Sequence, residues 1–169
     1  MKSLYILRHA KALPPDDVTE DFDRSLSEKG KKDAEDMGGF LAFKEITVDL
    51  VISSSAKRAW KTTKKVTKRI GYRKDLIVSD FRVYEAGSGE LLEIIRAVDD
   101  NCSSVMLCGH NPSVTRLANL LIDKAWIDDI PPCGICRIDF KTASWKDLSE
   151  KSGSLAFFEY PLKQIICRV

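Results

Sequence analysis

Residues 3–9 read Ser-Leu-Tyr-Ile-Leu-Arg-His, a short apolar run that ends on an arginine and a histidine. A second run at residues 105–110, Val-Met-Leu-Cys-Gly-His, has the same form and also ends on a histidine. Short continuous apolar runs are typical of strands that are buried on both faces of a parallel sheet. The two runs therefore predict two buried strands, each with a histidine at its C-terminal end.

The segments around these runs alternate between strand and helix patterns. We expect further strands at 48–53 and 76–78, and helices behind Ser27 and at 56–70, 89–98 and 111–124. Such alternation predicts βαβ units, hence an α/β fold with a mostly parallel sheet covered by helices on both faces. The tail differs, because segments 134–140 and 154–160 predict a hairpin at one sheet edge and 162–169 a further short strand.

The chain has 169 residues with 27 basic and 25 acidic side chains, and its net charge of +2 favours neither nucleic acid nor membrane as a partner. It contains no signal-peptide pattern and no apolar stretch long enough to cross a bilayer, so we expect a cytoplasmic protein. We also expect one domain over residues 1–169 and a monomer, since the sequence indicates no obligate partner face.

Five cysteines without a secretory signal favour free thiols. Cys133 and Cys136 form a CxxC pair, but the pair leads into an alternating strand pattern rather than opening a helix, as a redox motif does. A zinc site needs a second pair at matching spacing, and the sequence has none. We therefore favour ordinary thiols over a redox or metal role and expect no metal site.

His9 and His110 are the two histidines of the chain, and both follow predicted strands. Ligands of open α/β sheets bind at the C-terminal ends of strands, and Arg8 beside His9 favours an anion such as phosphate. Asn111 suits a helix N-cap and Pro112 a first helical position, so His110 is expected at an anion-binding helix start. The alternative is a histidine that only caps a buried turn.

Arg58 lies in the first turn of the predicted helix at 56–70. Cationic side chains usually avoid helix N-termini because the helix dipole repels them. An arginine there is explained by a phosphate bound between it and the helix. Three strand ends thus supply two arginines and two histidines to one edge of the sheet.

With these residues in order, the sequence resembles the histidine phosphatase superfamily, and most closely its small SixA-like phosphohistidine phosphatases. The matching segments are Arg8 to Lys11, Asp23 to Gly30, Ser54 to Ala59 with Thr62, Tyr84 to Ala86, and Gly109 to Pro112. Ser55 and Ser25 stand where the family often has proline, and we expect the second to loosen its loop. The resemblance implies a three-layer α/β/α sandwich of phosphoglycerate mutase-like fold with an antiparallel edge.

The resemblance also implies metal-free and cofactor-free phosphoryl transfer. His9 would be the nucleophile and would become phosphohistidine, while Arg8, Arg58 and His110 would hold the phosphate oxygens. His110 is expected to serve best as a cation, whose pKa a bound phosphate dianion would raise.

The proton donor and the outer contacts are less sharply indicated. Glu85 is our candidate acid by its position in a loop after the third strand, with Asp80 and Glu90 as rivals. Substrate contacts are expected from residues on neighbouring loops, namely Arg24, Asn111 and Lys11.

The predicted helix at 56–70 is rich in basic residues. Besides Arg58, six lysines and arginines lie from Lys57 to Arg69, and Arg73 and Lys74 follow before the first acidic residue, Asp75. We favour a solvated outer face over a surface that attracts acidic phosphoproteins.

Three functions are compatible with these residues. The leading hypothesis is a phosphohistidine phosphatase that acts on a phosphorylated protein, because the short segment between Glu85 and His110 leaves no room for a capping insertion. The alternatives are a phosphatase of a small phosphate ester and a phosphate-binding module without activity.

Overall fold

β1 (Lys2–Arg8) lies near the middle of a six-stranded sheet with the order β3-β2-β4-β1-β5-β6. The computed structural model describes residues 1–161, so the strand expected at 162–169 lies outside the described residues. The other strands are β2 (Leu50–Ser54), β3 (Val78–Asp80), β4 (Ser104–Gly109), β5 (Ile135–Phe140) and β6 (Gly153–Glu159). The helices are α1 (Glu28–Phe43), α2 (Lys57–Arg69), α3 (Arg82–Glu85), α4 (Ser88–Arg96) and α5 (Ser113–Leu121).

The sheet is parallel through four strands and antiparallel at one edge. β1, β4, β2 and β3 pair in parallel, whereas β5 pairs antiparallel with β1 and β6 antiparallel with β5. The predicted α/β class with a mostly parallel sheet and an edge hairpin is therefore confirmed. Among residues 1–161, no helix is both long and apolar enough to span a membrane.

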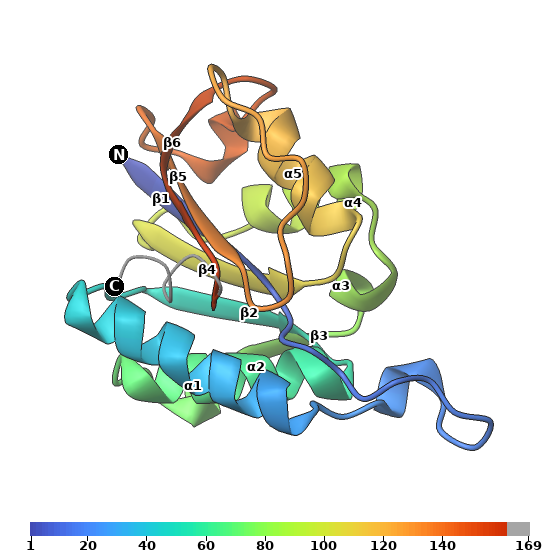
Figure 1. Ribbon diagram of the computed structural model, residues 1–169. Coiled ribbons are helices and arrows are strands. Elements are labelled where there is room, and N and C mark those ends of the chain that lie inside the picture. The colour runs from blue at the N-terminus through green and yellow to red at the C-terminus, as the bar shows by residue number, and fades with distance from the viewer. Residues whose placement is uncertain (162–169) are drawn as a thin grey trace.

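The helices cover both faces of the sheet, as Figure 1 shows, with α1 and α2 on one side and α4 and α5 on the other. The side chains of β4 alternate between the two cores because successive residues of a strand point to opposite faces. Leu107 packs in the core under α4 and α5, and Met106 packs in the core under α1 and α2. Both side chains are fully buried, so β4 is fixed from both faces.

The register of β1 against β4 brings the two histidines together. Arg8 pairs with Gly109, so each strand ends one residue before its histidine. The His9 amide then donates to the Gly109 carbonyl at 3.1 Å, which continues the pairing past the strand ends. The sheet therefore places His9 and His110 side by side at its C-terminal edge.

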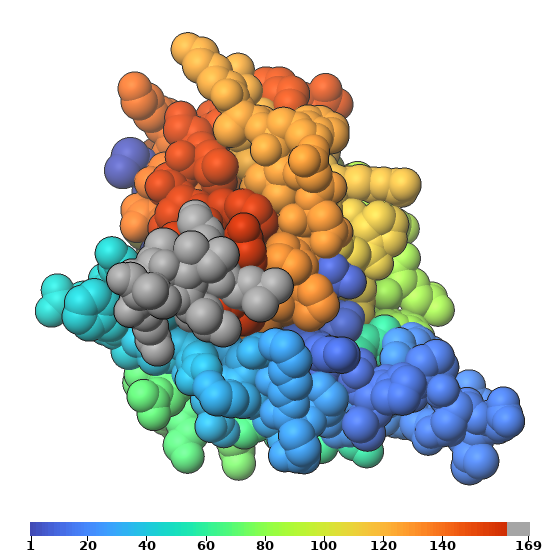
Figure 2. Space-filling view, in the orientation of Figure 1, coloured from blue at the N-terminus to red at the C-terminus, as the bar shows by residue number. Residues whose placement is uncertain are grey.

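The start of α1 agrees with the sequence prediction. The Ser27 hydroxyl accepts a hydrogen bond from the Gly30 amide at 3.0 Å, as an N-cap does. Gly30 also permits a close approach, because a Cβ atom there would lie 2.1 Å from the Lys11 carbonyl oxygen. The helix start thus holds the chain that leaves His9, while the segment between them stands out from the body of the molecule (Figures 1 and 2).

Some predicted boundaries were wrong. The third strand begins at Val78, because residues 74–76 form a 3-10 turn. Glu85 ends the short helix α3 and is not in a loop. α5 begins at Ser113, so Asn111 is not its N-cap. The Asn111 side chain instead forms tertiary hydrogen bonds, which compete with a capping role.

Candidate active site

The ring of His9 is held in one orientation by its own backbone neighbour. Its Nδ1 lies 2.7 Å from the Ala10 carbonyl oxygen, and the Ala10 amide is fixed in turn by Thr62 Oγ1 at 2.9 Å. A carbonyl can only accept, so the proton lies on Nδ1 and Nε2 keeps its lone pair. Burial, with smaller contributions from the charges of Arg58 and Arg8, lowers the pKa of His9 to about 4, although the Ala10 hydrogen bond acts in the opposite direction. The imidazole is therefore neutral at pH 7, as the predicted nucleophile must be.

His110 faces His9 at a ring-centroid distance of 5.1 Å. Its Nε2 is 2.8 Å from Ser54 Oγ, and the ring of Tyr84 meets its ring edge-on at 5.5 Å between centroids. Burial, followed by the charge of His9, lowers the pKa of His110 to about 3. In the ligand-free site His110 is thus neutral, and a bound dianion is needed to make it a cation.

Two arginines frame the histidine pair. Arg58, only 6% exposed, donates through Nε to His9 Nε2 at 3.3 Å. Arg8 is anchored through Nη1 to the Ile130 carbonyl at 2.8 Å, and burial lowers its pKa. The predicted set of Arg8, His9, Arg58 and His110 is therefore assembled in one place.

Two buried polar atoms of this site lack a hydrogen-bond partner in the described part of the chain. They are Arg8 Nε and His110 Nδ1. Buried polar groups are almost always paired, and leaving one unpaired costs about 1–3 kcal/mol. Such atoms beside a nucleophile are suited to bind the oxygens of a phosphate.

Asp21 is a site residue that the sequence analysis missed. Its carboxylate accepts from Arg58 Nη2 at 2.9 Å, from Arg24 Nη2 at 2.8 Å and from the Tyr84 hydroxyl at 2.8 Å. Burial opposes its ionisation, but the hydrogen bonds from Tyr84, Arg24 and Arg58 outweigh burial and hold the pKa of Asp21 well below its ordinary value. The carboxylate thus makes the contacts that a phosphate would make with the same cations.

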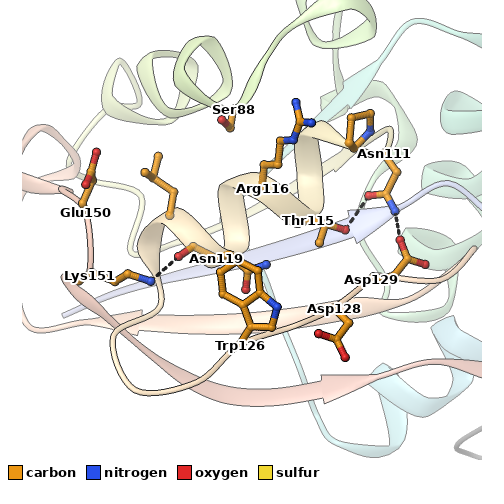
Figure 3. Close-up of a pocket in the computed structure, with 12 residues that line it drawn as sticks. Ser88, Asn111, Thr115, Arg116, Asn119, Trp126, Asp128, Asp129, Glu150 and Lys151 are labelled. Carbon is orange, nitrogen blue, oxygen red and sulfur yellow. Dashed lines mark hydrogen bonds between the residues drawn. The ribbon is translucent and has the colours of Figure 1, made fainter.

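Asn111 lies at the rim and shares its partners with Arg8. Its amide donates to Asp129 Oδ1 at 2.6 Å and to the Ile130 carbonyl at 3.1 Å, and Arg8 binds the same two residues. Thr115 completes this link by donating to Asn111 Oδ1 at 2.8 Å. Figure 3 shows Asn111, Thr115 and Asp129 at one end of a cavity of about 570 Å³ along α5. Trp126, which is 69% exposed, also lines this cavity.

The three candidate acids are placed differently from the histidine pair. Glu85 is exposed and lines a separate hollow with Glu90. Asp80 pairs with Arg82 at 2.6 Å, and Glu90 accepts from the Gly87 amide at 2.7 Å. The general acid therefore stays a prediction.

Lys11 and Cys133 lie on the α1 side of the sheet, whereas Cys136 packs in the core under α4 and α5. Lys11 is exposed and lines a small hollow with Lys29 and Pro131. Cys133 and Cys136 are buried, which raises the pKa of the Cys136 thiol to about 12 and that of Cys133 well above its ordinary value. Thiols held in the neutral form are poor nucleophiles and metal ligands, which favours a packing role.

Of the site residues that the sequence analysis did not name, some lie in segments that it had identified and others do not. Tyr84 and Ser54 belong to segments that the sequence analysis had singled out, next to Glu85 and Arg58. Asp21 and Asp129 carry no such signal, because each is one of several neighbouring acidic residues outside the predicted helices and strands.

Comparisons with known proteins agree with this geometry. Residues 4–94 match the model of the histidine phosphatase superfamily (branch 1). An uncharacterized protein of Mycobacterium tuberculosis is 29% identical over 164 residues, which cover 92% of this chain and 99% of that protein. A structure assigned as phosphohistidine phosphatase SixA from Agrobacterium tumefaciens has a TM-score of 0.78 and 28% identity, covering 95% of this chain and 99% of that one.

A SixA protein histidine phosphatase bound to tungstate shares the fold, with a TM-score of 0.80 at 17% identity over 96% of this chain and 99% of that one. The family model covers more than half of the chain, and the fold match extends over nearly all of it. These matches confirm the resemblance and the phosphoglycerate mutase-like fold. The protein is a member of the histidine phosphatase superfamily, branch 1, and thus a hydrolase of the metal-independent histidine phosphatase type.

Proposed function

We propose that this protein removes phosphate from a phosphohistidine side chain of another protein, with His9 as the transient phosphate carrier. The observation that carries the proposal is the neutral ring of His9, whose Nε2 lies beside Arg58 with the unpaired nitrogens of Arg8 and His110 in the same site. The likeness to the SixA structure from Agrobacterium tumefaciens supports the same substrate class.

The reaction has two steps. His9 Nε2 attacks phosphorus in line, a new N–P bond forms, and the P–N bond to the substrate imidazole breaks as the proposed acid, Glu85, donates a proton to that ring and later takes one back from the attacking water. Water then attacks phospho-His9, which releases inorganic phosphate and restores the neutral ring. Arg8, Arg58 and His110 stabilise the charge on the phosphate oxygens in both steps.

The surroundings of the site favour a protein substrate over a small ester. Between Glu85 and His110 the chain forms α4 and β4, whose apolar side chains are used in the core. That stretch therefore supplies no lid, and an open site accepts a side chain presented on a large partner more easily than it encloses a metabolite.

The first test is direct detection of the intermediate. Incubation with a phosphohistidine peptide followed by rapid quench should label the protein with acid-labile, base-stable phosphate. His9→Ala should remove the label and lower kcat by about 10⁴-fold or more. His110→Asn should retain the label but lower kcat by about 10²-fold, because one oxygen contact is lost. An unlabelled wild-type protein that still binds phosphate would support a binding module instead.

The proposed acid role of Glu85 is tested by comparing two leaving groups. The leaving group of a phosphohistidine is an imidazole, which needs less protonation than the alkoxide leaving group of an alkyl phosphate. Glu85→Gln should therefore lower kcat on an alkyl phosphate about 10²-fold and on a phosphohistidine peptide severalfold. Asp80→Asn and Glu90→Gln are the matched controls. An equal loss on both substrates, or a larger loss in a control, would refute the assignment.

A further inference from the structure

A basic groove lies between α1 and α2 and has a volume of about 1050 Å³. We call it the α2 groove. Its cationic lining residues are Lys31, Lys61, Lys64, Lys65, Lys68, Arg69, Arg73 and Lys74, and its acidic one is Glu35. The groove therefore carries seven net positive charges, whereas the whole chain carries +2. Since the rest of the chain is net acidic, this concentration is a local property of one surface.

Three of these eight cations pair with carboxylates. Lys31 pairs with Glu28, Lys65 pairs with Glu35 at 2.5 Å, and Arg73 pairs with Asp75. Lys64, Lys68 and Lys74 have no carboxylate within 4 Å among residues 1–161. Like charges held this close repel one another, and an anionic partner relieves that repulsion. The side chains are thus available to a ligand.

The groove begins at the edge of the active site. Arg58, which contacts His9, and Lys61 lie one turn apart on α2. Lys61 Nζ donates to Ser25 Oγ at 2.8 Å, and the neighbouring residue Arg24 binds Asp21. From Arg58 to Lys68 the helix rises about 15 Å, at 1.5 Å per residue. A ligand in the groove would therefore extend from the phosphate site along about 15 Å of surface.

We propose that the α2 groove docks an acidic segment of the phosphoprotein whose phosphohistidine enters the site. This inference rests on the proposed function and adds the partner's chemistry to it: carboxylates beside the phosphorylated residue. An acidic protein fits better than a nucleic acid, because the chain as a whole is nearly neutral. In addition, the one aromatic ring of α2, Trp60, lies 5.5 Å from Lys64 Nζ and is already engaged with that cation.

The experiment compares two phosphohistidine peptides that differ only in a flanking tract of six glutamates or six glutamines. Six extended residues span about 20 Å, enough to follow the groove. At low salt, wild-type protein should show a KM about tenfold lower for the glutamate peptide, with equal kcat, and the difference should vanish at high salt. Lys64→Glu/Lys68→Glu should remove the preference without changing kcat on the glutamine peptide.

The matched control is Lys124→Glu/Lys141→Glu, which makes the same change in net charge at exposed lysines outside the groove. The control should keep most of the preference. If both peptides are hydrolysed with equal KM, or if the control loses the preference equally, the docking inference is wrong and the proposed function stands. If neither peptide is hydrolysed, the proposed function fails.

A binding measurement decides the docking inference independently of turnover. Fluorescent, unphosphorylated glutamate and glutamine peptides are titrated with protein and followed by anisotropy, with a single-stranded oligonucleotide as competitor. Binding of the glutamate peptide that Lys64→Glu/Lys68→Glu weakens about tenfold would support the groove as an acidic-peptide site. Absence of such binding, or much tighter binding of the oligonucleotide at the same lysines, would overturn it.

Discussion

His9 and His110, which we propose act in phosphoryl transfer, are both held in the neutral form. Each ring is largely buried among cations, and their pKa values fall to about 4 and 3. Because the chain has two histidines, its imidazole NMR signals are few enough to assign by one substitution. Ligand-free protein should show no histidine titration between pH 5.5 and 8. Added inorganic phosphate should move the His110 midpoint upward, since a dianion stabilises the imidazolium.

His9→Gln assigns the two signals in this titration. A midpoint near 6.5 for either ring in ligand-free protein would contradict the buried, neutral pair. Much at this scale was predictable from the sequence, because Arg8, His9 and His110 follow apolar strands whose ends meet by simple topology. The unpaired nitrogens of Arg8 and His110 were not predictable, since they depend on the packing of distant segments.

At the scale of elements, the segment from β1 to α1 matters because Asp21 lies on it. Its carboxylate uses donors of Arg58, Arg24 and Tyr84 that a phosphate would need. An incoming anion therefore competes with a resident one. Asp21→Asn keeps the shape but removes the charge, and should tighten binding of inorganic phosphate or tungstate about tenfold, which is about 1.4 kcal/mol. Isothermal titration calorimetry measures this change.

Asp23→Asn is the matched control, because Asp23 is exposed on the same 3-10 turn and loses the same charge. Equal tightening in both variants would show a general charge effect and not a competition. The sequence predicted the helix cap of this region, because the hydrogen bond from the Gly30 amide to the Ser27 hydroxyl joins residues that are close in the chain. The role of Asp21 was not predicted, because its hydrogen-bond partner Arg58 is distant in sequence. Asn111 was wrongly predicted as an N-cap for the same reason, since its side chain binds Asp129.

At the scale of the whole molecule, the site reduces stability in acid. Both histidines have folded-state pKa values below their ordinary 6.5, so the unfolded chain binds more protons as the pH falls below 6.5. This stability is fully present above pH 6.5 and is lost progressively as the pH falls from 6.5 toward the folded-state pKa values of about 4 and 3. His110→Asn removes one of these groups while leaving the β1–β4 pairing intact.

Between pH 7 and pH 4.5, wild-type protein should therefore lose about 2.5 kcal/mol more free energy of unfolding than His110→Asn, at about 1.4 kcal/mol per pKa unit. Urea unfolding at the two pH values measures the difference. The depressed carboxylates, such as Asp21, also contribute to acid loss, but equally in both proteins, so the comparison isolates His110. Parallel stability curves would mean that His110 is not neutral in the folded chain. The fold would then hold a preformed cation at its phosphate site.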